Sequence, residues 1–92
     1  MTAEEVARCR QELAELRRRP ANVKRDEVES LALRMGYQFK PKRSGEPRYD
    51  KPGRFPLAIP GHKTINKYTL KSILERLEED LDREEEELTR GD

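Results

Sequence analysis

The chain has 92 residues, of which 42% are charged and 33% hydrophobic, with a formal net charge of +1 at pH 7. Such a length allows one small domain, and its core must come from a few well-placed side chains. The single cysteine excludes an intrachain disulfide and a cysteine-based metal site. We see no signal peptide and no apolar run of membrane-spanning length, so we expect a cytoplasmic protein without metal, cofactor or membrane contact.

The charges are unevenly distributed along the chain. Residues 38–76 hold ten Lys or Arg against three acids, whereas residues 77–92 hold nine acids against two Arg. A basic segment of this kind is typical of proteins that bind polyanions. The alternative is a solvated surface whose charges are shared unevenly. The acidic end of the chain also has two interpretations: it either folds back over the basic segment or is an ordinary charged helix end.

The first predicted element is a helix over residues 2–19. Thr2 is a capping residue before acidic residues, and Pro20 stops the helix after three arginines. The apolar residues form a narrow seam with spacings of three, four and three: Val6, Cys9, Leu13 and Leu16. This seam must be covered, either by another part of the chain or by a second copy.

The second predicted helix spans residues 24–35, with Asn22 as a candidate cap. Four apolar residues fall on one helical face: Val28, Leu31, Ala32 and Met35. Gly36 follows, and a left-handed glycine commonly ends a helix.

Three short strands are predicted next. Residues 37–40 alternate between aromatic and polar side chains, residues 48–49 form a second strand after the turn KRSGEP, and residues 55–59 alternate again. Pro56 places the third strand at a sheet edge or a bulge. We predict a three-stranded antiparallel meander, with Tyr37 and Phe55 in the core.

The last predicted element is a long helix that begins after Asn66 or at Thr69. Its buried stripe consists of Leu70, Ile73, Leu74, Leu77 and Leu81. Beyond Leu81 acids replace the apolar residues, so we expect fraying there unless the first helix packs against it. The two helices could also meet across a homodimer, through residues 3–19 and 77–88.

Two stretches, GYQFKPKRSGEPRY and RFPLAIPGHKTINKYTLKSILERL, resemble the HicA family of toxin–antitoxin mRNA interferases. A helix ends at Gly36, a third strand ends in Pro60 with His62 two residues later, and residues 69–74 resemble the start of the family's last helix. The resemblance covers about residues 24–81. It implies an α+β fold of order α-β-β-β-α, similar to the double-stranded-RNA-binding domain, an RNA target and an antitoxin-like protein partner. We therefore expect an accessory helix (1–20), a HicA-like domain (21–81) and an acidic extension (82–92).

The resemblance also implies a catalytic position. The family's loop reads glycine-serine-histidine, and here Ser44, Gly45 and Glu46 occupy it. A carboxylate can act as a base but is ionised at pH 7, so a second residue must act as the acid. The only histidine, His62, is the candidate acid. Each residue also has a simpler interpretation, Glu46 as a turn residue and His62 as a solvent-facing or capping side chain.

Basic residues flank the predicted hairpin and the start of the last helix. We predict that RNA phosphates are bound by Lys40, Lys42, Arg43, Arg48, Arg54, Lys63 and Lys67. Tyr49 is a candidate for base stacking. The alternatives are that these cations only solubilise the surface, and that the chain is a non-catalytic interaction or dimerisation module built on its long helices.

Overall fold

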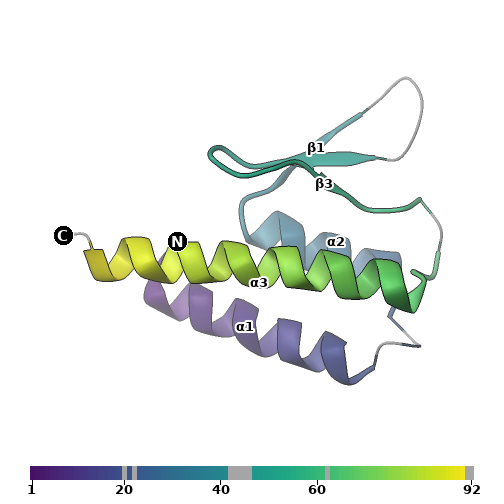
Figure 1. Cartoon of the computed structure of the whole chain (residues 1–92), viewed down its shortest axis with the longest axis horizontal. Helices are drawn as coiled ribbons and strands as arrows, with labels where there is room; N and C mark the ends of the chain where they lie inside the picture. Colours follow the sequence, from purple (N-terminus) through teal and green to yellow (C-terminus); the bar gives the residue numbers. More distant parts are fainter. Residues whose placement is uncertain (20, 22, 42–46, 62, 91–92) are drawn as a thin grey trace.

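The computed structural model describes residues 1–19, 21, 23–41, 47–61 and 63–90. In chain order its elements are α1 (Ala3–Arg18), α2 (Arg25–Arg34), β1 (Gln38–Lys40), β2 (Arg48–Asp50), β3 (Leu57–Ala58) and α3 (Lys67–Arg90). The sheet lies on one side of α2 and α3, and α1 lies on their other side (Figure 1). The predicted α+β class, with an α-β-β-β-α core and an extra N-terminal helix, is confirmed.

Helix α1 runs antiparallel to α3 and packs along it (Figure 1). It begins at a capping box, in which the Glu5 N–H donates to Thr2 Oγ1 over 3.2 Å and the Thr2 N–H donates to Glu5 Oε1 over 2.8 Å. The predicted seam of Val6, Cys9, Leu13 and Leu16 is buried. The seam is therefore covered within one chain, and the contact uses the surface that a homodimer through residues 3–19 and 77–88 would need.

Helix α2 is held at both ends. At its start the Lys24 N–H donates to Glu27 Oε1 over 3.3 Å, and the Arg25 N–H donates to the Lys63 carbonyl over 3.0 Å. At its end Gly36 has φ of 99°, as predicted for a left-handed glycine. The predicted cap Asn22 lies outside the described residues. The bond to Lys63 brings the start of α2 against the segment that precedes α3.

The sheet has the order β1-β2-β3, and both pairs are antiparallel. The third strand is shorter than predicted, and the prediction that Phe55 lies in the core is wrong because its side chain is 79% exposed. Pro56 has no N–H to donate, and its carbonyl accepts from Arg76 Nη1 over 2.9 Å instead of a strand. Regular pairing therefore starts only at Leu57.

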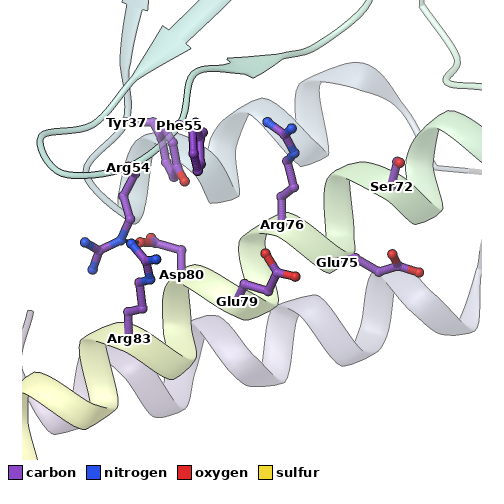
Figure 2. A pocket seen from close by; sticks show the side chains of 9 residues that line it. All are labelled: Tyr37, Arg54, Phe55, Ser72, Glu75, Arg76, Glu79, Asp80 and Arg83. Carbon is purple, nitrogen blue, oxygen red and sulfur yellow. Dashed lines mark hydrogen bonds and ion pairs between the residues drawn. The ribbon is translucent and has the colours of Figure 1, made fainter.

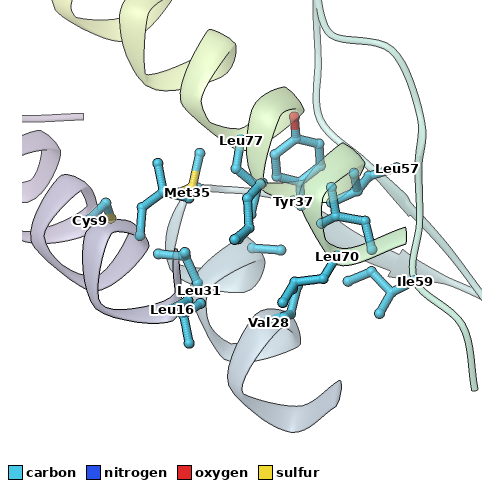
Figure 3. Close-up of a cluster of buried hydrophobic side chains, with 14 of the residues drawn as sticks. Cys9, Leu16, Val28, Leu31, Met35, Tyr37, Leu57, Ile59, Leu70 and Leu77 are labelled. Atoms are coloured by element: carbon cyan, nitrogen blue, oxygen red, sulfur yellow. The ribbon is translucent and has the colours of Figure 1, made fainter. Parts of the chain in front are cut away.

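One apolar core joins the layers (Figure 3). Tyr37 is buried as predicted, and so are Met35 and Leu31 of α2's apolar face. The sheet contributes Tyr49, Leu57 and the adjoining Ile59, and α3 contributes Leu70, Ile73, Leu74, Leu77 and Leu81. This shared core holds the sheet and the three helices together.

Helix α3 begins where the Tyr68 N–H donates to Asn66 Oδ1 over 2.8 Å, and it remains helical to Arg90. The first helix does pack against its second half, where Arg10 pairs with Asp82 and Glu85. Because α3 is continuous, its acidic half extends away from the start of α3 toward the end of the molecule where α1 begins (Figure 1).

Candidate nucleic-acid interface

The strand register places two predicted phosphate ligands together. Lys40 of β1 lies opposite Arg48 of β2, and Arg48 lies opposite Ala58 of β3. The alternate positions, Tyr49 and Leu57, are buried toward the helices. Lys40 and Arg48 are therefore neighbours on the face of the sheet that the helices do not cover.

The two cations differ in how far they are neutralised. Arg48 Nη2 lies 3.0 Å from Asp50 Oδ2 on the same strand, and the Arg48 side chain is 43% exposed. Lys40 is exposed and forms no ion pair with any residue that the structure describes. A partly exposed ion pair such as Arg48–Asp50 contributes little free energy to the stability of the fold. Arg48 can therefore exchange Asp50 for a phosphate with a small loss of stability.

Arg54 lies elsewhere, in an ion cluster between the β2–β3 turn and α3. Its guanidinium pairs with Asp80 and approaches Glu84 and Glu87, and its side chain is 11% exposed. Burial works to lower the pKa of Arg54, but the hydrogen bond and the charge of Asp80 outweigh it and raise the pKa. The placement does not fit the predicted phosphate contact, because carboxylates already occupy the guanidinium.

Lys63 and Lys67 occupy the approach to α3 and its first turn. Both are exposed, and neither forms an ion pair with another described residue. Thr64, next to Lys63, forms a bridge with Lys24 at the start of α2. The backbone that carries Lys63 is therefore anchored to the start of α2.

Four predicted residues lie outside the described part of the chain: Lys42, Arg43, Glu46 and His62. Their described neighbours meet, since the Ile59 N–H donates to the Pro47 carbonyl over 3.3 Å. Pro47 follows Glu46 directly, and Ile59 precedes His62 by three residues.

The model of the family described as HicA toxin of bacterial toxin-antitoxin matches residues 25–78. The chain belongs to the HicA toxin family. The match begins at α2 and includes the sheet and the first half of α3, whereas α1 and the acidic half of α3 lie outside it. No curated protein and no solved structure matches the chain significantly.

Sequence reasoning missed one polar cluster of this HicA domain. Tyr49 is fully buried, which corrects its predicted role in base stacking, and its hydroxyl donates to Glu29 while Arg25 Nη2 donates to it over 2.7 Å. Burial, together with the bond to Glu29, raises the pKa of Tyr49 to about 12. Arg25 and Glu29 are four residues apart on a predicted helix, but nothing in their spacing indicates a tyrosine 20 residues later.

A groove between the β2–β3 turn and α3 mixes both signs of charge (Figure 2). Asp80 and Glu79 face the same space as Arg76 and Arg83, and exposed Phe55 forms part of the rim. Such a surface does not concentrate the positive potential that a polyanion requires. The cations of the sheet face and of the α3 start, which are not mixed with acids in this way, are therefore the better candidate for such an interface.

Neither a metal centre nor a membrane span is found in the described part of the chain. Within residues 1–19, 21, 23–41, 47–61 and 63–90, no three His, Cys, Asp or Glu side chains are grouped to hold a metal ion. None of the described helices is long and apolar enough to cross a membrane.

Proposed function

We propose that this HicA family member binds RNA through the uncovered face of its sheet and the start of α3. The observation that carries the proposal is the register that sets Lys40 beside Arg48 on that face. Lys63 and Lys67 add two exposed cations at the approach to α3, and Lys42 and Arg43 belong to the β1–β2 connection. Phosphate contacts of this kind position a nucleic acid without reading its sequence.

The arrangement of charge along the molecule supports this assignment. The end of α1, the start of α2 and the start of α3 lie together at one end, and the acidic half of α3 lies at the other (Figure 1). The first turn of α3 has no acidic residue, whereas its second half contains Glu84, Glu85, Glu86 and Glu87. A polyanion is therefore attracted to the end that carries Lys63 and Lys67.

The proposed RNA-binding domain is catalytically degenerate. Glu46 replaces the histidine of the family's loop, and an ionised carboxylate cannot protonate a leaving oxygen and repels a phosphate. Cleavage by the native chain would require Glu46 as the base and His62 as the acid. We also propose an antitoxin-like protein as a partner, in keeping with the toxin–antitoxin family.

Purified wild type tests RNA binding by its salt dependence. We expect affinity for an unstructured RNA to fall roughly tenfold or more between about 50 and 200 mM salt, because counterions are released. Lys40→Ala and Lys67→Ala should each weaken binding and flatten the salt dependence. Arg90→Ala, at the acidic end, serves as the matched control and should not. Absence of binding at low salt would exclude the proposal.

Cleavage is tested in parallel with Glu46→His, Glu46→Ala and His62→Ala. We expect wild type to bind RNA with no cleavage above background, and Glu46→His to cleave at about 100 times that background or more, since a histidine can act both as base and as acid. A wild type that cleaves RNA and loses this activity in Glu46→Ala would show that the site is intact.

A further inference from the structure

An apolar groove lies between the end of α1 and the start of α3. Its lining comes from both helices: Arg17, Lys67, Tyr68, Leu70, Lys71, Leu74, Glu75 and Glu78. Leu70 and Leu74 form its floor and are almost completely buried. Arg17 lies in α1, outside the residues that match the HicA family, so one wall of this groove comes from α1.

Tyr68 projects from this groove into solvent. Its side chain is 73% exposed, although its backbone is fixed by the N–H bond to Asn66. The ring is therefore accessible to a ligand and is held at a fixed helix start. Planar rings held in this way are the platforms on which proteins stack the bases of single-stranded nucleic acids.

Cations flank the ring. Lys67 Nζ lies 5.2 Å from the centre of the Tyr68 ring, and Lys71 is one turn farther along the same helix face. Within the described chain, neither lysine has a carboxylate partner. Arg17 is tied to Glu78 over 2.7 Å, which holds the wall of the groove in place.

We propose that Tyr68 stacks on an unpaired base of single-stranded RNA while Lys67 and Lys71 bind the adjoining phosphates. The inference rests on the proposed RNA binding and extends it by naming the strand state and the contact. Lys67 belongs to both sites, so the groove continues the phosphate-binding surface around the start of α3. Duplex RNA, whose bases are stacked and paired, offers no base to this ring.

The full chain can be tested with two RNAs of equal length, one unstructured and one duplex. For the unstructured RNA, Tyr68→Ala should weaken binding by about 5- to 100-fold, Tyr68→Leu should weaken it similarly, and Tyr68→Phe should bind like wild type. Binding to the duplex should not change in any Tyr68 variant. Phe55→Ala is the matched control, because this ring is at least as exposed but lies outside the groove.

The outcomes separate the two proposals. If Lys40→Ala weakens binding of both RNAs while Tyr68→Ala changes neither, RNA binding stands and base stacking is overturned. Equal losses for single strand and duplex in Tyr68→Ala also overturn stacking. If wild type binds neither RNA at low salt, the proposed function itself fails.

Discussion

Lys51 Nζ lies 2.6 Å from Asp80 Oδ2, and this ion pair joins the β2–β3 turn to the middle of α3. The side chains are 10% and 1% exposed, respectively. Arg54 pairs with the other oxygen of Asp80, and Glu84 lies 2.9 Å from Lys51. Two cations of the basic segment are thus neutralised inside the molecule by acids of the last helix.

Removal of Asp80 should destabilise the fold strongly. Asp80→Ala leaves Lys51 and Arg54 buried with one fewer carboxylate, and breaking a buried pair costs roughly 3–5 kcal/mol. Urea unfolding followed by circular dichroism measures the loss. Asp82→Ala is the matched control, because Asp82 is 63% exposed in its pair with Arg10. Its removal should lower the free energy of unfolding by about 1 kcal/mol or less. Equal losses in the two variants would contradict an essential ion cluster.

The same cluster predicts sensitivity to acid. Burial works to raise the pKa of Glu84, but the hydrogen bond and charge of Lys51 outweigh it and lower the pKa below the ordinary value. A lowered folded-state pKa stabilises the protein above the unfolded-state pKa of about 4.3, and this contribution is lost as the pH falls through the folded-state value. Stability measured from pH 7 to pH 3 should therefore fall less steeply below pH ~4.5 in Glu84→Gln than in wild type. Identical pH slopes would count against this role of Glu84.

Helix α1 should behave as part of the domain. Leu13 is 3% exposed at the centre of the seam, so Leu13→Ala should lower the free energy of unfolding by about 2–5 kcal/mol. Gln11→Ala, on the exposed side of the same helix, should change it by less than about 0.5 kcal/mol. A single cooperative transition in every variant is expected. A Leu13→Ala protein as stable as wild type would show that the helix is not docked.

Gly36 should be required for its backbone conformation and not for its small size. With φ of 99°, alanine at this position should cost about 1–2 kcal/mol. Space is available, since the nearest atom to an added Cβ would be Lys51 Cε at 3.5 Å. Gly61→Ala is the control, because a Cβ there meets nothing within 4 Å and its φ is not positive. Thermal unfolding measures the loss of stability in each variant. Similar melting temperatures in Gly36→Ala and Gly61→Ala would refute the backbone explanation.

Periodicity predicted the elements well because helices and strands follow local sequence. The seam of α1, the left-handed Gly36 and the stripe of α3 up to Leu81 were all readable in this way. The continuation of α3 to Arg90 was harder to predict. Its buried face continues in Asp80 and Glu84, and only their distant partners Lys51 and Arg54 make such burial favourable.

The candidate site could be predicted only where local sequence pattern determines it. Adjacent strands of a meander bring Lys40 and Arg48 together, so local pattern was sufficient there. Arg54 was assigned to the same surface because it also follows a turn, but its side chain turns toward α3. Tyr49 shows the converse case, since its partners Arg25 and Glu29 come from a helix that only the three-dimensional fold brings near.

The antiparallel packing of α1 on α3 has a further physical effect. The molecule is 41 Å long, and Lys63, Lys67 and the end of α1 lie at one pole while the acidic half of α3 lies at the other. This separation places exposed cations at one pole and a run of acids at the other. The field of an approaching polyphosphate would turn the positive pole of the protein toward it before contact. A larger fraction of encounters should then lead to binding than if the two molecules met in random orientations. Potassium chloride would then slow association chiefly by weakening this pre-alignment.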